Sequence, residues 1–171
     1  MSSRGAFIVL EGLDRSGKST QAEKLVDYLR EQGKDVDHIR FPDRQEPFGR
    51  VIDAFLKRQV EISSPQAMHL AFSLNRWQKA ASIRERVAAG AFVVADRYCY
   101  SGVAYSIAGG LDEKWVKQAD IGLPRPDLVL FFAVDAAGVN ASAAVEEVAE
   151  EVRGLVEGLR LSGELGSLTR L

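Results

Sequence analysis

The sequence predicts an α/β fold with three layers, in which helices cover both faces of a central parallel sheet. Short apolar runs alternate along the chain with longer stretches whose apolar residues recur at helical spacing. This alternation favours a parallel sheet, because each helix returns the chain to the edge where the next strand begins. A glycine-rich segment, Gly12–Ser19, directly follows the first apolar run. Ligands of such folds bind at the carboxyl ends of the strands, where we expect this segment to lie.

The expected strands are apolar runs bounded by glycine, proline or charged residues. They are, in chain order, Ala6–Leu10, Val36–Phe41, Phe92–Ala95 and Leu128–Val134. The first run is apolar throughout, which predicts burial on both faces. Pro42 closes the second strand, and the rigid connector Leu123–Pro126 leads into the fourth.

The expected helices follow from the spacing of apolar residues and from signals at helix ends. They are Ser19–Glu31, the segment 48–56, a long helix from Pro65 to about Gly90, the short segments Ser101–Ile107 and Glu113–Ala119, and a last helix after Ser142. Gly33 is suited to end the first helix, and Ser64 with Pro65 is a start signal for the long one. Ser142 is expected to cap the last helix. The predicted buried face of that helix carries Val145, Val148, Val152, Leu155 and Leu159.

Composition describes an ordinary globular chain of one domain, over residues 1–171. With 22 Lys and Arg against 24 Asp and Glu, the formal net charge is −2. This balance gives no electrostatic reason to expect nucleic acid or an anionic membrane as a partner. The single Cys99 excludes an internal disulfide and indicates a reducing compartment. Without a signal-peptide core or an apolar run that could span a bilayer, we expect the protein in the cytoplasm, or in the nucleus by diffusion.

The segment Gly12–Ser19 fits the P-loop pattern G-x-x-x-x-G-K-[ST] between a strand and a helix. Its glycines let backbone N–H groups converge on phosphate oxygens, and the following helix adds its N-terminal dipole. Lys18 can neutralise β- and γ-phosphates, and the Ser19 hydroxyl can ligate Mg²⁺. The residues expected around the ATP phosphates are Asp14, Arg15, Ser16, Gly17, Lys18, Ser19 and Thr20. The fold prediction thereby narrows to a P-loop NTPase fold, against the alternative of a chance glycine turn.

Two more strand ends carry charged residues suited to phosphoryl transfer. Arg44 follows the second strand and Arg97 the third, and arginine binds phosphate oxygens bidentately while staying charged. Asp96 lies where P-loop enzymes keep a carboxylate for Mg²⁺, so Ser19 and Asp96 are the expected metal ligands, directly or through water. The alternatives are solvated surface arginines and an aspartate that caps the next segment.

Phe72 and Arg76 are four residues apart and therefore share one face of the long helix. An aromatic ring for stacking and a guanidinium for a base carbonyl would suit a pyrimidine. Spacing alone favours the alternative, in which Phe72 fills the core. Asp14 adds a negative charge to a phosphate loop, so it is better suited to accept a hydrogen bond from a sugar hydroxyl.

Taken together, these segments resemble thymidylate kinases, a family of P-loop nucleoside-monophosphate kinases. The matching stretches are Glu11–Gln21, Arg40–Arg44, Phe72–Trp77, Asp96–Tyr98 with Ser101–Tyr105, and Gly122–Leu130. They cover residues 5–134 in the family's order, and the pattern is most similar to the eukaryotic branch. The resemblance implies that ATP donates its γ-phosphate to dTMP, giving dTDP and ADP with Mg²⁺.

The resemblance also implies roles for single residues. The implied catalytic residues are Arg15, Lys18, Asp96 and Arg97, with Arg15 as a catalytic arginine carried in the P-loop. The residues implied for dTMP binding are Asp14, Phe41, Pro42, Arg44, Phe72, Arg76, Arg97, Ser101, Gly102 and Tyr105. Tyr105 would crowd out a ribose 2′-hydroxyl. Family members are usually homodimers packed through helices, and a stripe such as Met68, Leu70, Ala71 and Leu74 would suit that interface or the core equally.

The chain departs from the family after its fourth strand. The family continues with a helix, an arginine-containing lid, another helix and a fifth strand before a loop that contacts adenine. Here Asn140, Ala141 and Ser142 resemble that adenine loop, a few residues after Val134. Because a strand–helix–strand unit needs about 30 residues, we predict that the lid and the fifth strand are absent near residues 137–138.

Three explanations of this gap compete: a lid region left out of the sequence, a truncated gene or gene model, and a deliberate deletion. Two alternative functions stay open: a lid-deleted protein that binds dTMP with little turnover, which depends on the gap, and another small-molecule P-loop kinase. The presence of the P-loop cations argues against the lid-deleted protein with little turnover. Phe72, Arg76 and Tyr105 argue against the second, because in the resembling family they form a pocket for a pyrimidine deoxyribonucleotide.

Overall fold

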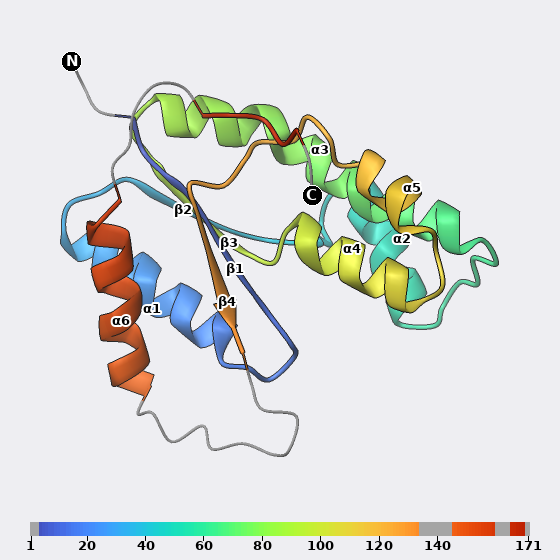
Figure 1. The fold of residues 1–171 in the computed structure, drawn as a ribbon, viewed down its shortest axis with the longest axis horizontal. Coiled ribbons are helices and arrows are strands. Elements are labelled where there is room, and N and C mark those ends of the chain that lie inside the picture. The colour runs from blue at the N-terminus through green and yellow to red at the C-terminus, as the bar shows by residue number, and fades with distance from the viewer. Residues whose placement is uncertain (1–3, 134–144, 160–164, 170–171) are drawn as a thin grey trace.

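The centre of the molecule is a parallel sheet of four strands, β1 (Phe7–Gly12), β2 (Val36–Arg40), β3 (Phe92–Asp96) and β4 (Leu128–Phe132) (Figure 1). This is a computed structural model, and it describes residues 4–133, 145–159 and 165–169. The strand order is β2-β3-β1-β4. Leu10 of β1 lies opposite Asp96 of β3 and Leu130 of β4, so the three strands end close together. The predicted parallel sheet is confirmed, as is the burial of β1 on both faces.

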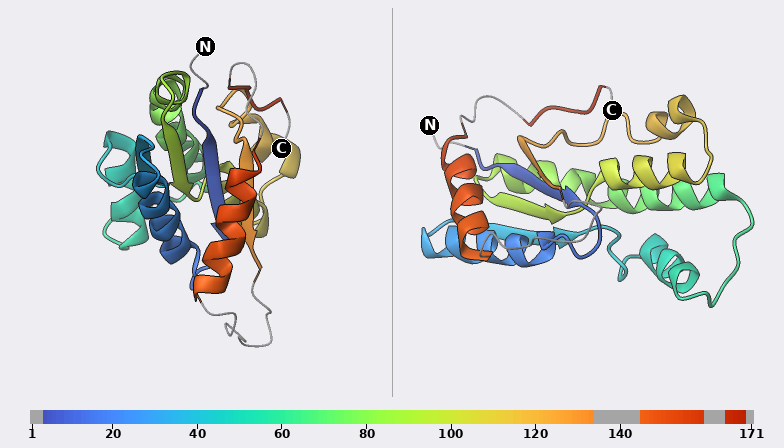
Figure 2. Two further views of the ribbon diagram at one scale, coloured as in Figure 1. Left: turned by 90° about the vertical axis from the view of Figure 1, so that its left-hand side faces the viewer. Right: turned by 60° about the horizontal axis from the view of Figure 1, so that its bottom comes forward.

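Helices cover both faces of this sheet. They are α1 (Lys18–Glu31), α2 (Pro47–Leu56), α3 (Pro65–Ala88), α4 (Cys99–Ala108), α5 (Glu113–Gln118) and α6 (Val145–Glu157). α1 and α6 lie side by side on one face, and the C-terminal half of α3 packs on the other (Figure 2). The N-terminal half of α3 extends past the carboxyl edge of the sheet, where α4 and α5 pack against it (Figure 1). The predicted three layers are therefore confirmed.

Two apolar cores hold the layers together. The core under α1 and α6 includes Ile8, Leu10, Leu25, Val94 and Val152. The core under α3 includes Phe7, Val9, Ile83, Val87 and Val93. Alternate residues of β1 enter the two cores, because successive side chains of a strand point to opposite faces.

The predicted signals at helix ends act as expected. Ser64 Oγ accepts a hydrogen bond from the backbone N–H of Ala67 at 3.2 Å, and Pro65 occupies the first position of α3. Gly33 follows α1 with a φ of +71°, a conformation that suits glycine after a helix. These contacts fix the start of α3 and the end of α1.

Some boundaries and one buried face differ from the prediction. β1 continues to Gly12, and α4 begins at Cys99 rather than at residue 101. In α6, Val145 and Leu155 are exposed, so their predicted burial is wrong. The helix packs on α1 and the sheet through Ala149, Val152 and Val156. Val145 is the first residue of the helix, before this packed part, and Leu155 lies to one side of the stripe. The expected Ser142 cap, the adenine loop and the gap near 137–138 lie outside the described residues.

No helix in the described part of the chain combines the length and apolar character needed to cross a membrane.

Candidate functional site

A pocket of about 590 Å³ lies at the carboxyl ends of the strands. Its lining residues are Asp14, Lys18, Ser19, Arg40, Phe41, Pro42, Arg44, Leu56, Phe72, Arg76, Asp96, Arg97, Tyr98, Ser101, Gly102, Tyr105 and Ser106. The P-loop, the turn after β2 and the turn after β3 all contribute to its walls, together with α3 and α4. Three separate strand ends therefore meet in one crevice, at the edge of the sheet where a ligand was expected.

The P-loop turns directly from β1 into α1. Gly12 and Gly17 have φ values of +148° and +83°, which side-chain-bearing residues rarely adopt. A Cβ on Gly12 would also meet a carbonyl oxygen of β4 at 2.7 Å. The buried Lys18 opens α1, and its Nζ donates a hydrogen bond to the carbonyl oxygen of Leu13 at 3.1 Å. Burial lowers the pKa of Lys18, and the nearby Arg97 cation lowers it further.

Of the predicted phosphate-binding residues, Asp14, Lys18 and Ser19 line the pocket, whereas Arg15, Ser16, Gly17 and Thr20 do not. Arg15 is exposed and has a φ of +65°, which is uncommon for a residue with a side chain. Gly17 and Thr20 are also exposed. Ser16 Oγ is buried without a hydrogen-bond partner in the described part of the chain. The roles of these residues at an ATP phosphate stay predictions.

Asp96 ends β3 at the floor of the pocket and is almost fully buried. Its Oδ2 accepts hydrogen bonds from Ser19 Oγ at 2.6 Å and from Arg40 Nε at 3.0 Å. Its Oδ1 is buried and has no hydrogen-bond partner among the described residues. An orphaned carboxylate oxygen beside a hydroxyl fits Mg²⁺, which prefers oxygen ligands. Sequence reasoning missed Arg40, although the residue ends β2 as Asp96 ends β3.

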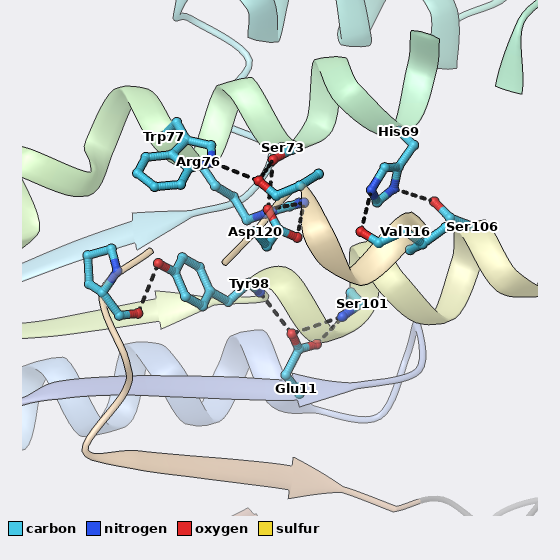
Figure 3. Close-up of polar contacts among 12 residues, drawn as sticks. Glu11, His69, Ser73, Arg76, Trp77, Tyr98, Ser101, Ser106, Val116 and Asp120 are labelled. Carbon is cyan, nitrogen blue, oxygen red and sulfur yellow. Dashed lines mark hydrogen bonds and ion pairs between the residues drawn. The ribbon is translucent and has the colours of Figure 1, made fainter. Parts of the chain in front are cut away.

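Arg97 follows Asp96 and has a φ of +70°. Its guanidinium donates to Ser101 Oγ at 2.8 Å and to Asp14 Oδ1 at 2.5 Å, so one residue of α4 and one of the P-loop hold it in the pocket wall. Sequence reasoning missed the buried Glu11 beneath this turn. Glu11 accepts hydrogen bonds from the backbone N–H groups of Tyr98 and Ser101 and from the Ser101 hydroxyl (Figure 3). The sequence signal for Glu11 was a single carboxylate at the end of an apolar strand.

Arg76 reaches the pocket from α3 and is itself buried. Its Nε and Nη2 donate to the carboxylate of Asp120, which also accepts a hydrogen bond from Ser73 Oγ (Figure 3). Sequence analysis did not single out Asp120, although it lies two residues before the matching stretch at Gly122. Phe72 is half-buried and lines the same pocket, so the predicted shared face of Phe72 and Arg76 is confirmed.

The remaining predicted dTMP-binding residues also line the pocket. Phe41 and Pro42 form the turn after β2, and Arg44 follows them with its Nη1 bonded to Asp53 Oδ1 at 3.0 Å. Tyr105 is 57% exposed, with its ring 5.8 Å from Arg97 Cζ. Ser101 and Gly102 come from the first turns of α4. The structure thus brings together every predicted dTMP-binding residue, whereas Asn140, Ala141 and Ser142 lie outside the described residues.

Comparison with known proteins identifies a related family. A model of the thymidylate kinase family matches residues 10–151. The chain is 47% identical over 140 residues to a thymidylate kinase of Caenorhabditis elegans, covering 77% of this chain and 64% of the relative. It is 50% identical over 132 residues to that of Schizosaccharomyces pombe, covering 77% and 62%. The chain therefore spans less than two thirds of the length of these relatives.

Solved structures give the same relationship. A thymidylate kinase from Candida albicans superposes with a TM-score of 0.83 at 28% identity, covering 99% of this chain and 100% of that one. A thymidylate kinase from Ehrlichia chaffeensis superposes with a TM-score of 0.68 at 22% identity, covering 92% and 90%, and supports the fold alone.

Proposed function

The chain belongs to the thymidylate kinase family, and on this premise we propose that it transfers the γ-phosphate of ATP to dTMP, giving dTDP and ADP. The observation that carries the proposal is the single pocket that joins Lys18 of the P-loop to Arg97 and to the pair Phe72 and Arg76. Such a pocket can hold two charged phosphates and one base at once, which a transfer between nucleotides requires.

On the acceptor side, each group has one task. Arg44 and Arg97 bind the acceptor phosphate, because guanidinium groups match its oxygens and stay charged. Phe72 stacks on the base, and Arg76 donates to a base carbonyl. Asp14 accepts a hydrogen bond from the sugar 3′-hydroxyl. This bond replaces the contact between Asp14 and Arg97, which leaves the Arg97 guanidinium free to bind the acceptor phosphate.

On the donor side, Lys18 and the backbone of the P-loop bind the β- and γ-phosphates of ATP. Ser19 and Asp96 would hold Mg²⁺, since the orphaned Oδ1 of Asp96 lies beside the Ser19 hydroxyl that bonds Oδ2. When bound, Mg²⁺ would neutralise charge that develops on the phosphate oxygens. Arg15 completes the cation set from the exposed side of the loop.

The test is formation of dTDP from dTMP and Mg-ATP by the purified chain, with dUMP, dCMP and dGMP as competing acceptors. We expect dTMP to be used in preference to dCMP and dGMP. A Lys18→Met variant should lose turnover, whereas Lys24→Met removes another lysine of α1, one paired with Glu146, and should not. Binding of dTMP without product favours the binding-only alternative. Preference for another monophosphate favours a different P-loop kinase.

The proposal includes a homodimer formed through helices. Met68 of the predicted stripe is buried, but Leu70 and Leu74 are 43% and 42% exposed on adjacent turns of α3. The neighbouring helix α2 exposes Phe48 and Val51. Exposed apolar side chains on two packed helices support an interface between copies. The free thiol of Cys99 suits a reducing compartment, so we include a cytoplasmic or nuclear location.

A further inference from the structure

We propose that Asp120 is a positioning residue for base recognition: it fixes the Arg76 guanidinium so that only its Nη1 faces the acceptor base. The inference rests on the proposed function, because the base belongs to the dTMP acceptor. No motif in the sequence points to Asp120, and its side chain does not line the pocket.

The contacts leave the guanidinium one orientation. Asp120 is fully buried and Arg76 is 2% exposed. Arg76 Nε and Nη2 donate to Asp120 Oδ1 at 3.0 and 2.9 Å, and Nη2 also donates to Oδ2 at 2.7 Å. Ser73 Oγ donates to Oδ1 at 2.8 Å and holds the carboxylate from one helical turn below Arg76 (Figure 3). Within the described residues no group accepts a hydrogen bond from Nη1.

The absence of a side chain at Gly102 leaves room for Arg76 Nη1 in the pocket wall. A Cβ at Gly102 would meet Arg76 Nη1 at 2.8 Å and Nη2 at 3.1 Å. Arg76 and Gly102 both line the pocket. The missing side chain of Gly102 therefore opens the space into which Asp120 directs the guanidinium.

The ion pair between Arg76 and Asp120 does more than join α3 to α5 and to the segment that follows it. Neutral hydrogen bonds already make that connection, from Trp77 Nε1 to the carbonyl oxygen of Ala119 and from His69 to the carbonyl oxygen of Val116. A buried ion pair stabilises a fold no better than well-packed apolar residues, because both charges lose their hydration. A charged pair at this point therefore indicates a task at the pocket.

That task follows from the chemistry of arginine. A guanidinium only donates hydrogen bonds, so a fixed Nη1 matches the carbonyl oxygen at C4 of thymine and not the amino group at C4 of cytosine. A site built to bond one polar group strongly disfavours an analogue that lacks it. Asp120 supplies this discrimination by keeping Arg76 from turning.

The test measures dissociation constants for dTMP and dCMP by calorimetry in the wild type and in Asp120→Asn. Asparagine keeps the volume but replaces one acceptor oxygen with a donor, so Arg76 loses its fixed orientation. We expect dTMP binding to weaken about tenfold and dCMP binding to change by less than about threefold. In steady-state kinetics, Asp120→Asn should raise KM for dTMP by a similar factor and leave kcat unchanged.

The matched control is Asp127→Asn, which breaks another largely buried ion pair with two hydrogen bonds, the pair of Asp127 with Arg4, away from the pocket. It should leave the dTMP to dCMP ratio unchanged.

Two further variants keep the inference testable if Asp120→Asn does not fold. Gly102→Ala leaves Asp120 unchanged but displaces the Arg76 guanidinium, because the new Cβ would lie 2.8 Å from Nη1 and 3.1 Å from Nη2, and it should lower the same ratio. In Arg76→Gln, adding Asp120→Asn should change the ratio no further, because Asp120 acts through Arg76. A folded Asp120→Asn or Gly102→Ala variant with the wild-type ratio overturns the role of Asp120. Wild-type protein without a preference for dTMP instead overturns the proposed function.

Discussion

At the scale of single residues, the arginines of the site differ in how firmly they are held. Arg76 is bonded to Asp120, and Arg97 is bonded to Asp14 and Ser101. Arg15 forms no salt bridge with any residue that the structure describes. We therefore expect the arginines held by carboxylates to serve recognition, and Arg15 to act on the transferred phosphate.

We predict that Arg15→Ala lowers the turnover of dTMP about a thousandfold or more, because a catalytic arginine stabilises charge in the transition state. The dissociation constant of dTMP should change by less than about twofold, since Arg15 does not line the acceptor pocket. Single-turnover kinetics and calorimetry measure the two effects. Arg58→Ala is the matched control, because Arg58 is another exposed arginine with positive φ, outside the P-loop. Equal turnover in Arg15→Ala would remove Arg15 from the catalytic set.

At the scale of elements, α3 carries Phe72 and Arg76 and reaches beyond the sheet. Its start therefore depends on local contacts, of which the Ser64 cap is one. We predict that Ser64→Ala lowers the free energy of unfolding by about 1 kcal/mol, because one backbone N–H of the first turn loses its partner. Urea denaturation measures this change. Ser64→Asp restores an acceptor and should stay near the wild type, so an equal loss in both variants would contradict the capping role.

His69 joins three elements at the outer end of the site. Its Nε2 lies 2.9 Å from the carbonyl oxygen of Val116, and its Nδ1 lies 2.8 Å from Ser106 Oγ. Nε2 must donate to the carbonyl oxygen, so Nδ1 accepts from Ser106 in the neutral ring. Burial lowers the pKa of His69 from its ordinary value of 6.5. The folded state therefore binds fewer protons than the unfolded state at mildly acidic pH.

We predict that this histidine contributes stability above pH 6.5, and that the contribution is lost as the pH falls below that value toward the lowered pKa. His69→Gln should flatten this part of the stability profile, measured by urea denaturation from pH 7.5 to about pH 5. The pKa of His38 is also lowered by desolvation, but His38 is present in both proteins, so its effect cancels in the comparison. Parallel profiles for the two proteins would show that His69 has no such effect.

At the scale of the whole molecule, two of the surfaces that expose apolar side chains could join copies of the chain. One is the pair of packed helices α2 and α3, with Leu70 and Leu74. The other is β4, an edge of the described sheet, where Phe131 is 71% exposed. Edge strands with exposed apolar residues favour indefinite association, whereas packed helices can form a closed interface.

We therefore predict that Leu70→Glu combined with Leu74→Glu converts a dimer to a monomer, because the charges would be buried in the interface. Phe131→Lys should leave the dimer intact and reduce only higher association. Sedimentation velocity at several concentrations distinguishes the species. A dimer that survives the double glutamate variant and dissociates in Phe131→Lys would assign the interface to β4 instead.

Several features of this molecule follow from local sequence patterns. The strand–helix alternation, the P-loop at Gly12–Ser19 and the Ser64 cap each depend on residues close together in the chain. Parallel topology then brings the ends of β1, β2 and β3 to one edge. For this reason, the crevice and the presence of Lys18, Asp96 and Arg97 in it were predictable before any coordinates.

The partners of these groups were not predictable, because they come from distant segments. Glu11 bonds the backbone of Tyr98 across 87 positions, Arg40 bonds Asp96 across 56, and Asp120 holds Arg76 across 44. Each isolated carboxylate or arginine is equally compatible with a solvated surface until the fold buries it. The burial of Leu155 in α6 was mispredicted for a related reason, since the neighbouring α1 selects which stripe of the helix is covered, whereas the predicted burial of Val152 is confirmed. Local chemistry thus specifies which groups the site contains, and packing over long sequence separations specifies which of them are held and which are left for a ligand.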